Sequence, residues 1–120
     1  MKKYLVLAMM VLTNMSIYSY DVGIDGIFYN LSESEAEVTY EELSGSSPYA
    51  LYSLYTGTIV IPDSITYLGK IYNVTKIGMR AFYRCGGLNS VTVPNSVTTI
   101  GEYNQEIMGK TNVEIIPVIA

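Results

Sequence analysis

Two stretches of apolar and polar positions return along the chain at fixed offsets. Residues 74–78 (VTKIG) return as residues 97–101 (VTTIG), an offset of 23 residues. A second segment is also repeated: residues 59–66 (IVIPDSIT) reappear in similar form as residues 91–98 (VTVPNSVT). A period in the twenties is typical of solenoids, in which one supersecondary unit is stacked on the next. The pattern therefore predicts a short array of β-rich coils.

The chain before this repeat has the pattern of antiparallel hairpins. Asp25-Gly26 is a turn dipeptide between two β-prone runs within residues 20–31, which predicts a hairpin. Gly69-Lys70 predicts a second hairpin turn. Further strands are expected over residues 36–40 (with Val38 and Tyr40 on one face), 58–61 (ended by Pro62), 65–68 and 71–77. We expect residues 20–73 to form a β-rich cap that offers its last strand to a parallel stack.

Residues 74–101 contain one full repeat. Ala81 and Phe82 are expected to begin a short helical turn, which Gly86-Gly87 ends by taking the left-handed conformation. Strands are expected over residues 88–93 and 97–100. The apolar residues expected to point inward as the repeat core are Ile77, Phe82, Cys85, Leu88, Val91, Val93, Val97 and Ile100. Each coil would be covered by the next one and could not bury its own face.

The sequence of this unit, IGMRAFYRCGGLNSVTVPNSVTTIG, resembles the BspA-like leucine-rich repeat, whose usual pattern is IGxxAFxxCxxLxxVxIPxSVxxIG. The region before it resembles the N-terminal cap of exported bacterial members, so the resemblance covers residues 20–101. It implies a mainly β fold, with a hairpin cap leading into a short leucine-rich-repeat solenoid. It also implies a recognition surface of the kind that this family uses to attach to host proteins and other cells.

The pattern fails after residue 101. Asn104 and Gln105 stand where the repeat would place Ala and Phe, although residues 113–117 again fall 23 positions after residues 90–94. Residues 102–120 are therefore either a degenerate terminal repeat or the end of a truncated or drifted array. The apolar tail over 115–120 is unlike the polar outer face of a capping unit, so we expect a frayed C-terminus that can support self-association.

The first nineteen residues have the layout of a secretory signal peptide. Lys2 and Lys3 form a positive region, residues 4–12 are apolar, and a more polar stretch ends at Ser19, after which we expect cleavage. The apolar run is shorter than the ~20 residues of a membrane-spanning helix. We expect a protein that is secreted or held at the cell surface, with no membrane span after cleavage.

Composition narrows the possible functions. The chain has a net charge of -4 and no histidine, so it lacks both the basic surface that nucleic acid needs and the commonest general base and metal ligand. Cys85 is the single cysteine and sits at a core position, which favours a structural role over a nucleophile. The known phosphate-binding, hydrolase and metal motifs are absent from the sequence. We expect no enzymatic activity and no cofactor or metal.

Three tyrosines, Tyr49, Tyr52 and Tyr55, recur at a spacing of three in the segment before the repeat. They form either an exposed aromatic patch that contacts a partner or a short helical turn whose tyrosines pack on the sheet. The main functional hypothesis is thus an exported, non-enzymatic protein-binding module that contacts a host or cell-surface protein. The alternative is a truncated fragment of a longer repeat protein, with no function of its own.

Overall fold

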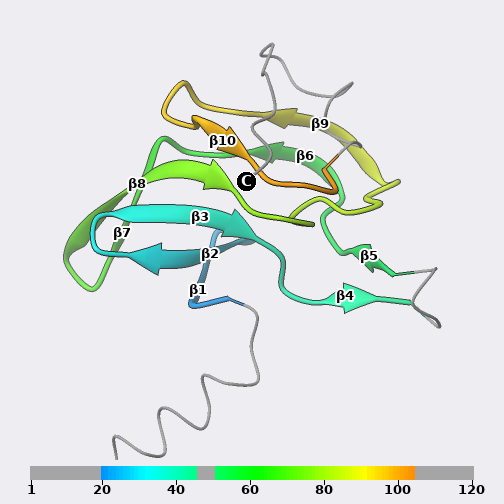
Figure 1. The fold of residues 1–120 in the computed structure, drawn as a ribbon, viewed down its shortest axis with the longest axis horizontal. Helices are drawn as coiled ribbons and strands as arrows, with labels where there is room; N and C mark the ends of the chain where they lie inside the picture. The colour runs from blue at the N-terminus through cyan, green and yellow to red at the C-terminus, as the bar shows by residue number, and fades with distance from the viewer. Residues whose placement is uncertain (1–19, 46–50, 105–120) are drawn as a thin grey trace, which may run out of the picture.

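The computed structural model describes residues 20–45 and 51–104, and the elements assigned there are all β-strands (Figure 1). They are β1 (Val22–Ile24), β2 (Ile27–Ser32), β3 (Glu35–Thr39), β4 (Leu43–Ser44), β5 (Tyr52–Ser53), β6 (Gly57–Val60), β7 (Ser64–Tyr67), β8 (Lys70–Ile77), β9 (Leu88–Thr92) and β10 (Thr99–Ile100). The expected mainly β fold is confirmed. The predicted signal peptide, Tyr49 and the tail beyond Asn104 lie outside the described residues.

Three tight hairpins, β1–β2, β2–β3 and β7–β8, build the part of the chain before the repeat. The turn between β1 and β2 is Asp25-Gly26, as expected, with φ angles of 52° and 82°. The turn between β7 and β8 is Leu68-Gly69 and not Gly69-Lys70, because Tyr67 pairs with Lys70 and leaves only two residues between the strands. Both central residues of such a turn need positive φ, and Leu68 adopts 51° beside Gly69 at 79°.

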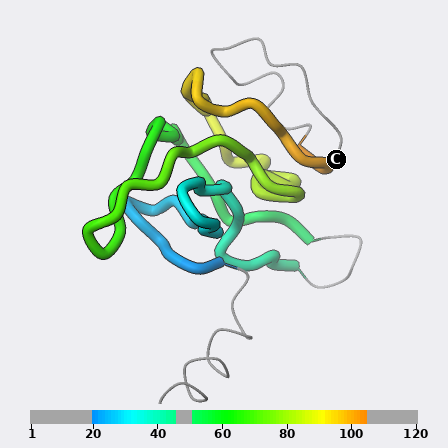
Figure 2. The backbone as a smooth tube through the Cα atoms, turned by 60° about the vertical axis from the view of Figure 1, so that its left-hand side comes forward, coloured from blue at the N-terminus to red at the C-terminus, as the bar shows by residue number. Residues whose placement is uncertain are grey.

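The repeat offsets seen in the sequence are the registers of the parallel strands. Lys76 of β8 pairs with Thr99 of β10, 23 positions later, and Ile59 of β6 pairs with Val91 of β9. The stack begins with β3, which is antiparallel to β2 and parallel to β8. Sheet order is therefore β1-β2-β3-β8-β10, with β6-β9 as a second, smaller sheet. Figure 2 shows the chain winding from the blue N-terminal strands to orange β10 on the opposite side.

The core lies inside these coils. Seven of the eight predicted repeat-core residues are buried, and Val97 is half-buried and packs against the others. The N-terminal strands and their neighbours add further buried apolar side chains, including Val22, Ile27, Tyr29, Ala36, Val38, Tyr55, Ile61, Ile65 and Val74. One continuous cluster thus joins the first strands to the repeat, as expected when coils bury each other's faces.

The repeated glycine of the VTxIG block has a steric cause. Gly101 donates its N–H to the carbonyl of Ile77, 2.7 Å away, as Gly78 does to the carbonyl of Val38. A Cβ on Gly101 would lie 2.6 Å from the backbone nitrogen of Met79, which is too close for any side chain. Glycine at this position therefore lets consecutive coils approach closely.

The segment between β8 and β9 differs in detail from the expected helical turn. Residues 79–84 form successive turns with bonds such as Ala81 N–H to the Gly78 carbonyl and Tyr83 N–H to the Arg80 carbonyl, and a helix is not assigned to them. The left-handed residue that ends these turns is Arg84, with φ of 51°, and neither Gly86 nor Gly87 has positive φ. The described residues contain no helix long and apolar enough to cross a membrane.

Candidate binding surface

The two described candidate tyrosines have different surroundings. Tyr52 lies on strand β5, not on a helical turn, and its side chain is 42% exposed. Tyr55 is only 6% exposed, so it cannot belong to an exposed patch. A helical spacing of three does not describe this segment, because β5 pairs with β4 as a short hairpin.

Tyr55 connects the N-terminal strands to the repeat. Its hydroxyl accepts the N–H of Phe28 at 2.9 Å and donates to the carbonyl of Thr39 at 2.6 Å. Phe28 and Thr39 are paired residues on β2 and β3, so the hydroxyl is inserted into the end of that ladder. The ring of Tyr55 lies 4.9 Å, centroid to centroid, from the ring of Phe82 in the repeat. One side chain therefore closes the antiparallel sheet and contacts the first repeat turn.

The buried tyrosines are expected to lower the free energy of unfolding at alkaline pH. Burial, and to a smaller extent the Asp25 carboxylate, raises the pKa of Tyr29 to about 12. Burial also raises the pKa of Tyr55, and the hydrogen bond from Phe28 offsets only part of that rise. An unfolded tyrosine loses its proton near pH 10, so above this pH the folded state binds more protons than the unfolded state.

We therefore expect full stability below about pH 10 and a decline above it, with a slope of up to about 1.4 kcal/mol per pH unit for each tyrosine. Urea unfolding between about pH 9 and pH 11 measures this slope. The Tyr29→Phe variant should have a shallower slope than the parent protein. A free energy of unfolding that stays constant over this range would contradict the expectation.

A second group of tyrosines lies at the surface together with arginines. We call it the Arg–Tyr cluster, and it consists of Met79, Arg80, Tyr83, Arg84 and Tyr103. The Arg80 guanidinium carbon lies 4.5 Å from the Tyr103 ring centroid and 5.7 Å from that of Tyr83. The Arg84 guanidinium carbon lies 5.3 Å from the Tyr83 centroid. Tyr83 and Tyr103 meet edge to face, with centroids 5.9 Å apart.

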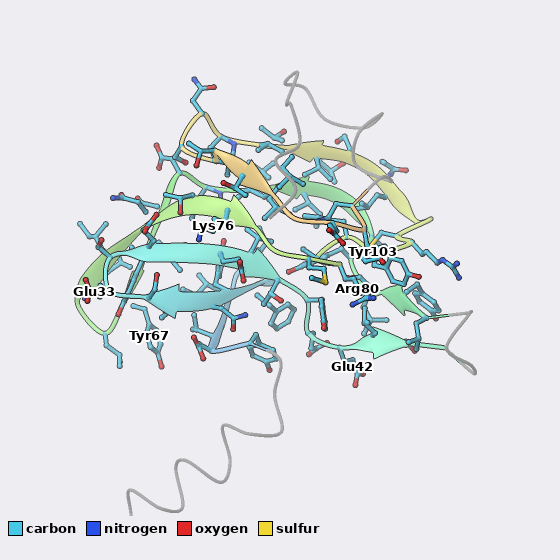
Figure 3. The ribbon with its side chains drawn as sticks, in the orientation of Figure 1. Glu33, Glu42, Tyr67, Lys76, Arg80 and Tyr103 are labelled. Carbon is cyan, nitrogen blue, oxygen red and sulfur yellow. The ribbon has the colours of Figure 1, made fainter. Side chains whose placement is uncertain are left out.

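The cluster is accessible and occupies one end of the molecule. Met79 and Tyr103 are 48% and 41% exposed, and Arg84 is also exposed. Figure 3 shows Arg80 and Tyr103 side by side, at the opposite end from Glu33. Strand β5 runs beside the cluster, because Ser53 donates its N–H to the Tyr83 carbonyl. Tyr52, which precedes Ser53, is an exposed tyrosine on this neighbouring strand.

The backbone under the cluster is unusual. Arg80, Arg84 and Tyr103 have φ angles of 61°, 51° and 63°. A residue other than glycine in this left-handed region costs about 1 kcal/mol or more, and such strain is concentrated at functional sites. Arg80 and Tyr103 are also 23 positions apart, so they occupy the same place in successive repeats. Both positions adopt a left-handed backbone, which glycine would accept with less strain. This chain has arginine at position 80 and tyrosine at position 103.

Asn104 lies directly behind the cluster and is buried. Its side-chain oxygen accepts the N–H of Phe82 at 2.9 Å, and its amide nitrogen donates to the carbonyls of Gly78 and Gly101, each at 2.9 Å. The sequence pattern treats Asn104 as a failed Ala position. In the structure it satisfies backbone groups of two coils at once and so fixes the turns that carry Arg80 and Tyr103.

Cys85 is buried, with its sulfur 3.5 Å from the Ser53 carbonyl oxygen, consistent with a core position. Among the described residues, no group of three or more carboxylates, histidines or cysteines is arranged to hold a metal ion. The exposed Arg–Tyr cluster is thus the most distinctive surface that these residues offer.

The comparisons with known proteins agree with the fold. The sequence profile of the BspA type leucine-rich repeat region, which spans six copies, matches residues 47–115, more than half of the chain. The chain therefore belongs to the BspA-type leucine-rich repeat family. No curated protein matches the sequence.

One solved structure is similar to this chain. It is a leucine-rich repeat protein from Bacteroides ovatus ATCC 8483, with 28% identity and a TM-score of 0.61. The match covers 80% of this chain and 24% of that structure, so this chain spans about a quarter of its length. The shared part gives the repeat fold, and a leucine-rich repeat is a scaffold for protein interaction.

Sequence reasoning missed the Arg–Tyr cluster. Arg80, Tyr83 and Arg84 fill the variable positions of the pattern IGxxAFxxC, and Tyr103 fills a variable position of the next unit. The fixed positions of the pattern predict the core residues, but they give no information about the residues at the variable positions. Arginine and tyrosine at several variable positions of one turn, in a chain with so few cations, is the signal that would have found them.

Proposed function

We propose that this protein is an exported, non-enzymatic recognition module that binds a protein of a host or of another cell through the Arg–Tyr cluster. The observation that carries the proposal is the stacked arrangement of two arginines and two tyrosines at the surface, in which Arg84 and Tyr103 are exposed and Arg80 and Tyr83 are half-buried. Tyrosine and arginine are the residue types enriched in the energetic centres of protein interfaces. Because the rings already hold the guanidinium groups, less side-chain entropy is lost on binding.

Export is supported by the N-terminal pattern of Lys2 and Lys3 followed by an apolar run and a small residue at position 19. We expect a culture that expresses the full chain to release a protein, or display one at its surface, whose first residue is Tyr20. Mass measurement of the intact protein from the medium and from the cell envelope checks this. A product that retains Met1 and stays in the cytoplasm would contradict export.

The binding proposal predicts the effect of removing the two arginines. Each of Arg80→Ala and Arg84→Ala should weaken binding to the partner roughly tenfold, because a charge-assisted contact at a partly desolvated site is lost. Surface-plasmon measurements against purified extracellular-matrix proteins, with whole-cell adhesion beside them, provide the test.

Lys70→Ala is the matched control. Lys70 also stacks on a tyrosine, with its Nζ 5.2 Å from the Tyr72 ring centroid, but it lies on the β7–β8 hairpin away from the cluster. This variant should bind like the parent protein. If all three variants bind equally well, the partner contacts another surface and the assignment of the cluster is wrong.

A further inference from the structure

We infer that a groove beside the first hairpin binds a lysine side chain of a protein partner, through its ammonium group and its methylene chain. The groove has a volume of about 310 Å³ and lies between the β1–β2 hairpin and the chain that runs from the end of β6 into β7. It shares no residue with the Arg–Tyr cluster. The inference therefore goes beyond the proposed function and is tested separately from it.

Tyr29 supplies a buried hydroxyl that has no partner within residues 20–45 and 51–104. The residue lines the groove and is only 1% exposed. The phenol oxygen forms no hydrogen bond there, yet it is not one of the fully enclosed polar atoms. Buried polar groups normally have a hydrogen-bond partner, because leaving one unmade is costly. The hydroxyl is thus a group that a ligand entering the groove can satisfy.

Asp25 gives the groove a negative charge. It is exposed in the β1–β2 turn, and the described residues that line the groove include no lysine or arginine. Burial raises the pKa of Tyr29 to about 12, and the Asp25 carboxylate adds to this rise because it lies near the phenol. A carboxylate and a neutral phenol oxygen both accept N–H donors, so together they suit an ammonium group. An anionic ligand would be repelled.

The rest of the groove is mainly apolar. Its apolar lining residues are Ile24, Ile27, Val60, Pro62 and Ile65. A lysine side chain lays its methylenes along such a surface while its ammonium stays with polar groups. The volume also fits one side chain, since it lies at the small end of the range of about 300–1,000 Å³ for ligand pockets. A sugar is a poorer match, because the ring of Tyr29 is buried and offers no open face for stacking.

Two exposed hydroxyl residues favour a lysine that belongs to a polypeptide. Ser64 and Thr66 of β7 line the groove and are exposed, and neither hydroxyl has a hydrogen-bond partner among the described residues. These hydroxyls can bond the peptide groups on either side of a bound lysine. A free alkylamine has no such groups to offer them.

Peptide titrations followed by NMR test the inference. The probe is the capped peptide Gly-Ser-Lys-Ser-Gly, and the controls are the same peptide with norleucine in place of lysine, and free n-pentylamine. We expect the probe to shift the backbone amide signals of Gly26 and Thr66. The norleucine peptide keeps the carbon chain without the ammonium, so it should bind at least fivefold more weakly. n-Pentylamine should also bind more weakly than the probe.

Two conservative variants test the polar groups of the groove. Asp25→Asn removes the charge and keeps the turn, because asparagine before glycine is favoured in a two-residue hairpin turn with positive φ. Tyr29→Phe removes a hydroxyl that forms no hydrogen bond within the described residues. Each variant should lower the affinity for the probe three- to fivefold and keep the thermal midpoint of the parent protein.

Glu33→Gln and Arg80→Ala are the controls. Glu33→Gln removes an equal charge from an exposed turn outside the groove, and Arg80→Ala changes only the Arg–Tyr cluster. Both should bind the probe like the parent protein. Equal binding of the lysine and norleucine peptides would overturn the inference, as would an unchanged affinity of Asp25→Asn and Tyr29→Phe. Binding of n-pentylamine without binding of the probe would make the groove a site for small amines and overturn its assignment to lysine.

Discussion

Replacing Tyr55 with phenylalanine is expected to lower the free energy of unfolding by about 2–3 kcal/mol. The substitution keeps the ring against Phe82 but removes the hydroxyl that accepts from the Phe28 N–H and donates to the Thr39 carbonyl. Both backbone groups would lose their partner in a largely buried place, and each such loss costs about 1 kcal/mol or more. Urea unfolding monitored by circular dichroism measures the difference.

Tyr52→Phe is the matched control, because Tyr52 is 42% exposed and only three residues away. It should change the free energy of unfolding by less than about 0.5 kcal/mol. A Tyr55→Phe variant as stable as Tyr52→Phe would mean that the hydroxyl does not hold the β2–β3 ladder closed. In that case the contact between the N-terminal strands and the repeat would depend on the ring alone.

Restoring the family's alanine at position 104 is expected to destabilise the protein by about 2 kcal/mol. Asn104→Ala leaves the N–H of Phe82 without its partner and removes the amide donor from the carbonyls of Gly78 and Gly101, although the Gly78 carbonyl keeps the N–H of Ala81. Alanine stands at the equivalent position 81, where the Ser53 hydroxyl donates to the Ala81 carbonyl at 2.8 Å. Thermal and urea unfolding of the variant give the measurement.

Asn95→Ala provides the comparison, since Asn95 is an exposed asparagine in the turn after β9. It should be neutral within about 0.5 kcal/mol. If Asn104→Ala is equally neutral, the amide is not the group that completes the last described turn. The NMR signals of Arg80 and Tyr103 add a second readout, because loss of the amide should also loosen the Arg–Tyr cluster in front of it.

The fold was predictable because the registers of its parallel strands equal the offsets of two repeated segments in the sequence. The pairs Lys76 with Thr99 and Ile59 with Val91 have the offsets of these two segments, and the buried positions follow from the same alignment. The Asp25-Gly26 turn was predictable for a different reason, since only a few residue types accept positive φ at both centres. The strand registers depend on sequence repetition and the turn depends on local residue preference, and a single sequence shows both.

The binding surface was harder to predict because it depends on contacts between residues that the pattern leaves free. Tyr103 meets Arg80 only when successive coils are stacked, and the left-handed backbone of Arg80, Arg84 and Tyr103 has no signature in residue type. Tyr55 was misleading for a related reason. Its spacing from Tyr52 suggests a shared face, whereas Tyr52 on β5 is exposed and Tyr55, two residues after the end of β5, is buried.

The first coil is longer than the second, and this has a consequence for how such a protein can change over evolutionary time. From Glu37 to its partner Lys76 the chain takes 39 residues, whereas from Lys76 to Thr99 it takes 23, yet both pairs lie in the same sheet. Closing the longer arc costs only about 0.5 kcal/mol more in chain entropy. The extra residues include the β4–β5 hairpin, which lies beside the Arg–Tyr cluster. Insertions in this longer loop can therefore change the surface beside the cluster while the paired strands of the core keep their register.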